Sequence, residues 1–455
     1  MSRYSFNFDI DISTFRGGIH PENDGKALSC NASIRTAPVF EYYHIPLQQN
    51  IGASPKWVVQ IGDTVKKGQK IAEADGFVSC PLHAPTSGTV EKIEKRPGTM
   101  GIPVETMILK SDMLDEACDF LPGLNWRECP SAELKQRIAE CGIVGMGGAA
   151  FPTAVKLSVP PDKKITDLIV NGAECEPYLT ADHRLMLECP EKVLIGASIM
   201  GRILGIDNIH IGVEMNKADA IETLIEHNKP YNVNIHGLQV QYPQGAEKQL
   251  IYAVTRRKVP AGGLPMDAGA VVQNVATAVA IAEAVIEGKP LFERITTITG
   301  EAVKTPGNWR LRIGTPLSKA LELADGITEE PGKIILGGPM MGFAQKSLEA
   351  SIQKNSGGLL LLPPSKVVQY CSSPCIRCGR CLNACPMNIN PSYLGTVIEN
   401  EKFDLALDSN VMDCIECGAC AYICPAHRPL VQHIRRAKAE IRSRMAAQKQ
   451  TDNKK

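Results

Sequence analysis

Apolar and polar positions change their spacing several times along the chain, and each change predicts a different kind of element. Over residues 30–112, valine and isoleucine alternate with polar residues in short runs. The runs are separated by four glycines, Gly62, Gly68, Gly76 and Gly88. Alternation interrupted by glycine is typical of β-hairpins. We therefore expect a β-rich domain over residues 30–112, preceded by an N-terminal arm over residues 1–29.

The pattern becomes α/β over residues 128–290. The stretch SAELKQRIAECG has helical spacing, and Ser131 is the expected cap of that helix. Three apolar runs, DLIVN, NIHIGVE and VNIHGLQV, then alternate with helical stretches. This arrangement predicts a mostly parallel sheet with helices on both faces. The stretch NVATAVAIAEAVIEG predicts a closing helix that ends at Gly288 and Pro290.

Two shorter units follow. Over residues 291–350, the order of strands, one helix and a further strand predicts a small α+β domain of the ubiquitin-like β-grasp type. Residues 357–364, GGLLLLPP, are predicted to be a linker into a cysteine-rich domain over residues 365–440. A basic helix, VQHIRRAKAEIRSRMAAQK, is expected after Pro425 and should lead into a disordered end of the chain, with residues 441–455 assigned to a polar tail.

Composition and charge argue against a nucleic-acid-binding, secreted or membrane-spanning protein. A chain of 455 residues should hold roughly three or four domains. The formal net charge is zero and aromatic residues make up only 5%, which argues against a surface for nucleic acid. A signal peptide needs an unbroken apolar run near the N-terminus, and Asp9 and Asp11 interrupt this stretch. We therefore expect the chain to stay in the cytoplasm. The longest apolar region, residues 268–286, contains Gln273 and Glu283 and does not predict a membrane span.

Half of the sixteen cysteines lie in two related runs, CIRCGRCLNACP and CIECGACAYICP. Both have the C-x2-C-x2-C-x3-C-P spacing of bacterial two-cluster ferredoxins, in which the fourth cysteine of one run binds the other 4Fe-4S cluster. Gly379 and Gly418 permit the tight turn within each run. Paired C-x2-C units also suit zinc, but two complete runs that end in proline favour clusters. The predicted ligands are Cys375, Cys378, Cys381 and Cys424 for the first cluster and Cys414, Cys417, Cys420 and Cys385 for the second.

The two runs carry different charges. Arg377 and Arg380 flank the first, whereas Glu416 and Ala419 occupy the equivalent positions of the second. Positive charge favours the more negative, reduced form of a cluster. The sequence therefore predicts a higher reduction potential for the first cluster, with a smaller effect if the arginines are solvated.

A glycine-rich loop, GIVGMGGAAFPTAVKL, begins at Gly142 and leads into a predicted helix. Its glycines let backbone N–H groups approach an anion, and the helix N-terminus favours a phosphate. A tight structural turn is the alternative, because glycine-rich turns are common. The stretch NGAECEP places Asn171, Glu174 and Glu176 after a predicted strand, at the end where α/β sheets usually bind ligands.

These two motifs, followed by YPQGAEKQL and QNVAT, resemble the flavin- and NADH-binding subunit of respiratory complex I. Together with FRGGIHPEN, GGPMMG and the cysteine runs, they make the chain similar, over about residues 13–440, to the C subunit of the Rnf (Rsx) family of ion-translocating electron transport complexes. The β-rich domain resembles the biotinyl/lipoyl type of barrel-sandwich hybrid. It lacks the modifiable lysine of those carriers, so we expect a structural or docking role.

The resemblance implies a set of cofactor-binding residues. The loop residues and a lysine would face FMN or its phosphate: Gly145, Gly147, Gly148 and Lys156. The rest of the flavin site would include Asn171, Glu174, Gly245, Asn274 and Thr277. Nicotinamide nucleotide would meet Phe151, Glu176 and Glu247. Met146 stands where the complex I family has arginine, and Ala246 replaces an acidic residue, which puts the affinity and orientation of NADH in doubt.

The implied fold is multidomain α/β plus β: a barrel-sandwich hybrid domain, a Rossmann-like FMN/NADH domain, an SLBB-like β-grasp domain and a helical ferredoxin-type domain with two 4Fe-4S clusters. NADH would pass a hydride to FMN, and single electrons would leave through the clusters, because a flavin takes electrons in pairs and releases them singly. No catalytic acid or base is assigned. The implied partners are integral membrane and other subunits of an Rnf-type complex, with ferredoxin reached indirectly. The chain would lie peripherally on the cytoplasmic side of the cell (inner) membrane, contacting it through partners.

Two other functions stay open. A flavin and iron-sulfur enzyme similar to cobalamin reductase would share the glycine loop and cluster pair, but we expect such enzymes to begin near that loop. A relay subunit with a vestigial NADH site is the second, favoured by Met146 and Ala246. Three further residues receive plain structural predictions: His83 as a turn residue, Cys371 as a spare thiol and Cys175 as a small packed residue.

Overall fold

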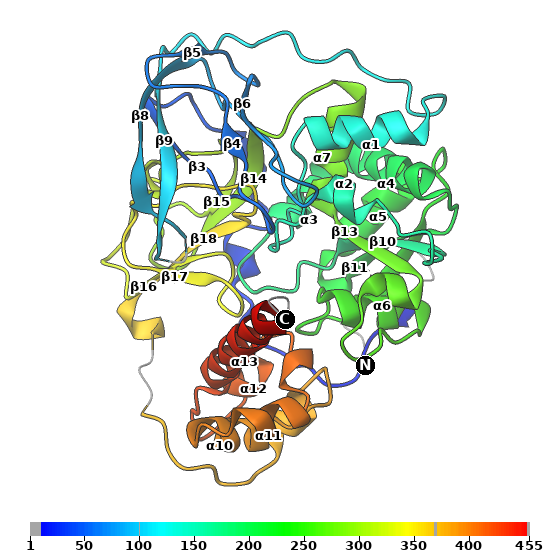
Figure 1. The fold of residues 1–455 in the computed structure, drawn as a ribbon, viewed down its shortest axis with the longest axis vertical. Helices are drawn as coiled ribbons and strands as arrows, with labels where there is room; N and C mark the ends of the chain where they lie inside the picture. The colour runs from blue at the N-terminus through cyan, green and yellow to red at the C-terminus, as the bar shows by residue number, and fades with distance from the viewer. Residues whose placement is uncertain (1–10, 100, 368–370, 453–455) are drawn as a thin grey trace.

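A computed structural model describes residues 11–99, 101–367 and 371–452 of the chain. Figure 1 shows a β-rich part and an α/β part side by side, with a helical C-terminal part against them. Among the described residues, no helix is long and apolar enough to cross a membrane.

A parallel five-stranded sheet forms the centre of the α/β part, as predicted. Every neighbouring pair in it is parallel. The strand order is β1 (Ile12–Ser13), β12 (Asn234–Leu238), β11 (Ile209–Glu214), β10 (Asp167–Gly172) and β13 (Ala270–Asn274). The edge strand β1 comes from the predicted N-terminal arm, so part of that arm belongs to this sheet.

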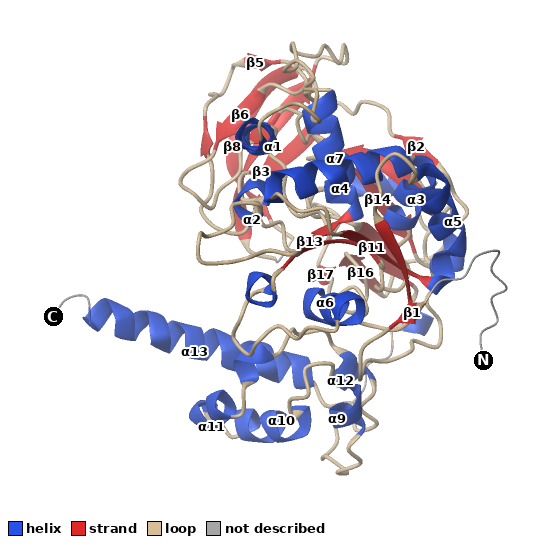
Figure 2. Ribbon diagram, turned by 90° about the vertical axis from the view of Figure 1, so that its right-hand side faces the viewer, coloured by secondary structure: helices blue, strands red, loops and turns tan. Residues whose placement is uncertain are grey.

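Helices cover both faces of the parallel sheet, because successive side chains of a strand point to opposite sides. On β10, Leu168 and Val170 join the apolar core on one face, whereas Ile169 joins the core under α6 on the other. Figure 2 shows α6 below the sheet. The helices are α1 (Ser131–Glu140), α2 (Thr153–Lys156), α3 (Ala181–Glu188), α4 (Pro190–Leu204), α5 (Ala218–His227), α6 (Glu247–Thr255) and α7 (Val275–Ile286). Ser131 is the first residue of α1 and not its cap, because Pro130 holds the cap position.

The β-rich part is built from two small antiparallel sheets around one apolar core, in which Tyr43, Ile45 and Met107 are fully buried. Gly62, Gly68, Gly76 and Gly88 all have positive φ, as the hairpin prediction requires. The sheets are β3 (Tyr42–Pro46), β9 (Pro103–Ser111), β8 (Gly88–Pro97) and β5 (Thr64–Val65), and β4 (Lys56–Trp57), β6 (Lys70–Glu73) and β7 (Leu82–His83). The prediction of a turn at His83 is wrong, because His83 is a buried residue of β7.

A six-stranded mixed sheet forms the third part. Its order is β17 (Phe343–Gln345), β16 (Lys333–Leu336), β18 (Gly358–Leu362), β14 (Glu293–Thr299), β15 (Gly307–Arg312) and β2 (Ile34–Thr36), with helix α8 (Leu317–Glu322). The predicted linker over 357–364 is wrong, because it contains β18, which pairs with β14 and β16. Leu359, Leu360 and Leu361 are fully buried. The first short strand, β2, lies within the range predicted for the β-rich domain but pairs with β15.

The C-terminal part is helical, with α9 (Arg380–Ala384), α10 (Pro391–Glu399), α11 (Phe403–Asp408), α12 (Ala419–Tyr422) and α13 (Leu430–Asp452). Short 3-10 helices span Lys26–Leu28, Met215–Lys217, Pro265–Ala268, Pro364–Lys366 and Val411–Asp413. The basic helix predicted after Pro425 is α13, and it continues to Asp452 because no glycine or proline interrupts it. The last residues of the tail, 453–455, lie outside the described residues.

Candidate functional site

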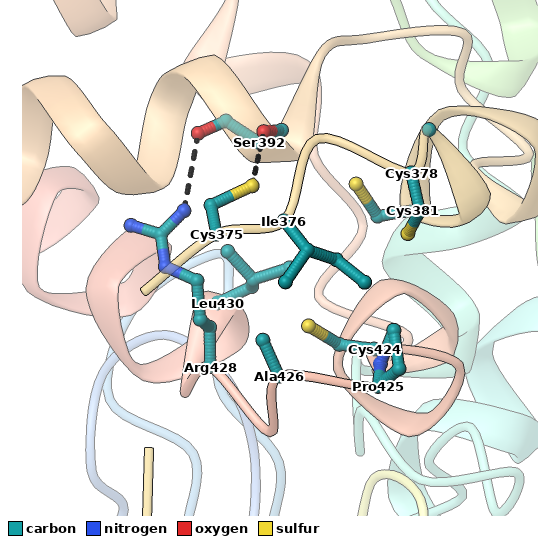
Figure 3. A pocket seen from close by; sticks show the side chains of 11 residues that line it. Cys375, Ile376, Cys378, Cys381, Ser392, Cys424, Pro425, Ala426, Arg428 and Leu430 are labelled. Carbon is teal, nitrogen blue, oxygen red and sulfur yellow. Dashed lines mark hydrogen bonds between the residues drawn. The ribbon is translucent and has the colours of Figure 1, made fainter. Parts of the chain in front are cut away.

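The first predicted cluster site is a cavity lined by the sulfur-bearing side chains of both cysteine runs. Figure 3 shows these side chains around one space. Cys375, Cys378, Cys381 and Cys424 all line it, so the fourth residue does come from the other run. Gly379 begins α9 in the left-handed conformation, with φ of 75°, and makes the predicted turn.

Groups around Cys375 favour the thiolate form of its side chain. Its Sγ lies 3.4 Å from Ser392 Oγ and accepts a hydrogen bond of 3.4 Å from the Arg377 backbone N–H. These bonds and the positive charge of Arg428 lower the pKa of the Cys375 thiol. A lowered pKa favours the thiolate, the form that binds metal.

The second predicted site is more deeply buried. Cys385, Cys417 and Cys420 are buried, and the pKa of Cys417 is raised to about 12 by burial and the nearby Cys414 and Cys385 thiols. Burial and the nearby thiols of Cys414, Cys417 and Cys385 also raise the pKa of Cys420. Gly418 begins α12 with φ of 82°. The structure therefore groups Cys385 with the second run, as the crossed pattern requires.

The spread of these thiols bears on the zinc alternative. In the described part of the chain, no three histidine, cysteine or acidic side chains converge closely enough for a single metal ion. A zinc ion draws four ligands to one centre, whereas a 4Fe-4S cluster binds each thiolate at a separate iron atom. Figure 3 shows the four cysteine side chains around one cavity, where a cluster would bind each of them at a separate iron atom.

The glycine loop lies against the end of β13. The backbone N–H of Met146 donates 2.9 Å to Thr277 Oγ1, and a side chain at Gly147 would lie 3.1 Å from Asn274 Cβ. Gly148 has φ of 130° and faces open space. The Gly145 N–H donates to the Phe151 carbonyl, which closes the loop. Glycine is required here because a larger residue at 147 or 148 would crowd Asn274 or strain the backbone.

Two other pairs of predicted residues meet beside this loop. Asn171 Nδ2 donates 2.8 Å to the Gly245 carbonyl, and the Gly245 N–H donates 3.2 Å to Cys175 Sγ. Cys175 is thus packed in the site, as predicted, and burial raises its thiol pKa. Lys156 Nζ forms an ion pair of 2.5 Å with Glu247 and remains partly exposed.

The two glutamates of NGAECEP have different surroundings. Glu174 accepts hydrogen bonds from the backbone N–H groups of Asp182 and His183 at the start of α3. Glu176 turns to the GGPMMG stretch, where the N–H groups of Met340 and Met341 donate to its carboxylate. Burial raises the Glu176 pKa to about 7. Within the described part of the chain, no hydrogen bond or ion pair joins Glu176 to another of the predicted residues.

Several residues of this region have no counterpart in the sequence predictions. Asp182 accepts a hydrogen bond of 2.6 Å from Asn274 Nδ2, and burial together with the Glu174 charge raises its pKa. The Lys26 ammonium is buried and donates to three carbonyls of the NGAECEP segment and its continuation, those of Glu174, Glu176 and Leu179. The N-terminal stretch FRGGIHPEN ends three residues before Lys26, but its composition does not reveal this contact.

Buried amide groups without partners in the described part of the chain lie next to two of the predicted residues. Both side-chain amide atoms of Gln244 and Nε2 of Gln273 are buried and have no hydrogen-bond partner among the described residues. These glutamines directly precede Gly245 and Asn274. A buried polar group without a partner costs about 1–3 kcal/mol. A flavin, whose ring offers both donors and acceptors, is a suitable partner for them.

A hollow of about 320 Å³ opens at the carboxyl ends of β11 and β12. Ligands of open α/β sheets usually bind at this end of the strands. The FRGGIHPEN arm forms one wall, and Cys175, Glu214 and Tyr242 line the others. None of the twelve predicted cofactor residues lines it, so the hollow adjoins the predicted site without coinciding with it.

Both cysteine runs pack against the α/β part. The Tyr242 hydroxyl, which is buried, donates 2.7 Å to the Cys417 carbonyl. The Gly18 N–H donates 2.9 Å to the Ala384 carbonyl, and Gln249 Nε2 donates 3.2 Å to that of Pro386. Ala384 and Pro386 end the first run and flank Cys385, a predicted ligand of the second cluster, whereas Cys378 of the first predicted site is exposed. Cys417 also shares an apolar cluster with Tyr242 and Cys175, so cysteines of the second predicted site are the ones next to these contacts with the α/β part.

Four family models match consecutive parts of the chain. They are a Nuo51 FMN-binding domain over residues 138–283, an RnfC barrel sandwich hybrid domain over 13–114, an SLBB domain over 295–344 and a 4Fe-4S dicluster domain over 374–428. The predicted fold classes, FMN and two 4Fe-4S clusters are confirmed by these matches, which decide against zinc.

Three curated relatives are similar over nearly the whole chain. The C subunit of the proton-translocating ferredoxin:NAD(+) oxidoreductase complex of Clostridium ljungdahlii is 49% identical over 95% of this chain and 95% of its own. The C subunit of the Na(+)-translocating complex of Acetobacterium woodii is 44% identical over 95% and 98%. The C subunit of the ion-translocating oxidoreductase complex of Rhodobacter capsulatus is 42% identical over 96% and 85%.

Proposed function

Because the chain belongs to the family of C subunits of ion-translocating ferredoxin:NAD(+) oxidoreductase (Rnf) complexes, we propose that it is the subunit at which such a complex exchanges electrons with NADH. The observation that carries this proposal is the Tyr242 hydrogen bond to Cys417, because it joins the flavin-binding part to a cluster run. A site for two-electron exchange and a site for one-electron exchange are thus neighbours.

The chain's residues would hold the flavin as follows. Gly147 and Gly148 leave space for a phosphate beside the loop backbone, and the partly exposed Lys156 supplies a positive charge. Asn171, Asn274 and Thr277 fix the surrounding loops through the contacts described above. Bound FMN would take the two electrons of a hydride and release them one at a time. Glu247 and Phe151 are assigned to the nucleotide side, and Glu176 to holding the GGPMMG stretch.

The eight cysteines would divide as the crossed pattern predicts. Cys385, Cys414, Cys417 and Cys420 would hold the second cluster, which would accept single electrons from the flavin first. Cys375, Cys378, Cys381 and Cys424 would hold the first cluster, and the exposed Cys378 favours this site as the outlet to another subunit. That outlet would belong to the membrane part of the complex, so the chain would lie peripherally on the cytoplasmic face and reach ferredoxin only through partners.

The alternatives make different predictions. A family similar to cobalamin reductase is disfavoured, because the barrel sandwich model matches ahead of the glycine loop, from residue 13. A relay with a vestigial nucleotide site would bind FMN but fail to react with NADH. Met146 is buried and its N–H is taken by Thr277, so it can shape the loop without offering the charge of an arginine.

The test is anaerobic addition of NADH to the purified chain, with flavin and iron content measured first. We expect NADH to bleach the flavin absorbance and then that of the clusters. Bound FMN that NADH does not reduce would support the relay and contradict the proposed exchange.

A further inference from the structure

The charges around the two cysteine runs differ from those that the sequence predicts. Arg377 and Arg380 of the first run are both exposed, and neither forms an ion pair with another described residue. Water and salt screen such charges strongly at the surface. Their effect on a nearby cluster should therefore be small.

In the second run, the acidic residue is neutralised by two cations from α13. Glu416 pairs with Lys438 at 2.6 Å and with Arg435 at 3.1 Å. Arg435 and Lys438 are three residues apart and therefore lie on one face of the helix. Glu416, Arg435 and Lys438 together carry a net positive charge, although Glu416 alone gives the cysteine run a negative charge.

Lys438 is the best placed of these cations. Its side chain is buried, and its ammonium donates a hydrogen bond of 2.8 Å to the backbone carbonyl of Cys414. The Cys414 thiol also accepts a hydrogen bond of 3.3 Å from the Glu416 N–H. A charge that is buried against a ligand acts through protein and not through water, so it is screened little.

The equivalent position of the first site has no such surplus. Arg428 lies beside Cys375, but it forms an ion pair of 2.5 Å with Glu399, which His433 also contacts at 3.2 Å. The buried cation there is balanced by an anion. The buried charge is therefore more positive beside the second site than beside the first, whereas the sequences of the two runs predict the reverse.

We propose that Lys438 is the positioning residue that raises the reduction potential of the second cluster, and that its effect exceeds the combined effect of Arg377 and Arg380 on the first. Each reduction adds one negative charge to a cluster, which a nearby ammonium stabilises. The inference rests on the proposed ligands of the second cluster. It assigns to α13 the task of making the cluster beside the flavin a ready electron acceptor.

The test is a redox titration of the purified holo protein followed by electron paramagnetic resonance. Lys438→Gln should shift the equilibrium of the second cluster toward its oxidised form by about tenfold, which lowers the midpoint by ~59 mV for a one-electron couple. Glu416→Gln, which leaves the lysine and removes the anion, should shift the same midpoint upward. Lys438→Arg should restore most of the wild-type value, since it keeps the charge. Arg377→Gln with Arg380→Gln should move the first midpoint by less than half as much.

A charge effect should shift the midpoint of the second cluster in opposite directions in Lys438→Gln and Glu416→Gln. General disruption of the site would shift it in the same direction in both variants. Lys402→Gln, at an exposed lysine of the same domain, is the control and should move neither midpoint. Two intact cluster signals with an unmoved second midpoint in Lys438→Gln would overturn the inference. Loss of one cluster from the wild-type protein, measured as iron content, would instead contradict the proposed function.

Discussion

Replacing Tyr242 with phenylalanine tests the contact between the flavin-binding part and the second cysteine run. Tyr242 is 1% exposed, and its hydroxyl donates 2.7 Å to the Cys417 carbonyl. Burial raises the pKa of Tyr242, so the hydroxyl stays a donor at any working pH. Phenylalanine keeps the buried ring but leaves the Cys417 carbonyl without this donor. An unsatisfied buried group costs about 1–3 kcal/mol, and we expect the docking of the C-terminal part to weaken by that amount.

The assay is anaerobic denaturation of the holo protein in urea, followed by the visible absorbance of the clusters. The midpoint of the Tyr242→Phe variant should fall, because the C-terminal part loses a contact that its folded state needs. Tyr252→Phe is the matched control, since the Tyr252 ring lies beside Arg256 and its hydroxyl has no hydrogen bond within the described residues. Equal midpoints for the two variants would refute the reasoning.

Three further substitutions test other parts of the structure. Burial raises the pKa of Glu176 from 4.5 to about 7, so its contribution of up to ~3 kcal/mol is present below pH 4.5 and lost as pH rises through 7. Glu176→Gln should therefore flatten the fall in unfolding free energy between pH 5 and 8, and parallel curves would contradict this. Lys156→Met should weaken FMN binding roughly 10-fold to 100-fold in a fluorescence titration, as for a lost charged hydrogen bond, and unchanged affinity would remove Lys156 from the site. Gly196→Ala should lower the unfolding free energy by about 1–3 kcal/mol, because its Cβ would lie 1.9 Å from the Ala278 carbonyl, and an unchanged denaturation midpoint would contradict that packing.

The elements with strong local signals were predictable from the sequence. The apolar runs of β10, β11 and β12 and the closing helix α7 lie where the pattern predicts them. The cysteine runs were equally clear, because they depend on residue types at fixed spacing, whereas the glycine loop alone left a tight structural turn as the alternative. Gly379 and Gly418 show this directly, since both adopt the left-handed conformation that begins a helix.

The missed elements depend on partners that are distant in sequence. The strand β18 reads as GLLLL between Gly357 and Pro363, and only its pairing with β14 and β16 makes it a central strand. The short strands β1 and β2 are too brief to show a period, and each is fixed by a sheet formed elsewhere. Pairing at a distance leaves no local pattern to read.

The same limit applies to the site. Cys385 could be assigned to the second cluster from spacing alone, but the charge around that cluster could not be assigned. Lys438 lies 24 residues after Cys414 and reaches it because α13 folds back along the run. Tyr242 was part of a recognisable motif, yet its bond to Cys417 joins residues 175 positions apart. Sequence motifs identified the cofactors, whereas the contacts between their sites required the folded chain.

The most direct test of electron exchange through this chain is rapid freeze-quench electron paramagnetic resonance after NADH is mixed with the holo protein. In the wild type, the signal of the second cluster should appear before that of the first. In a Cys417→Ser variant that retains flavin and the first cluster, NADH should still reduce the flavin, but the first cluster should stay oxidised on the same timescale. Undiminished reduction of the first cluster in that variant would contradict the proposed path.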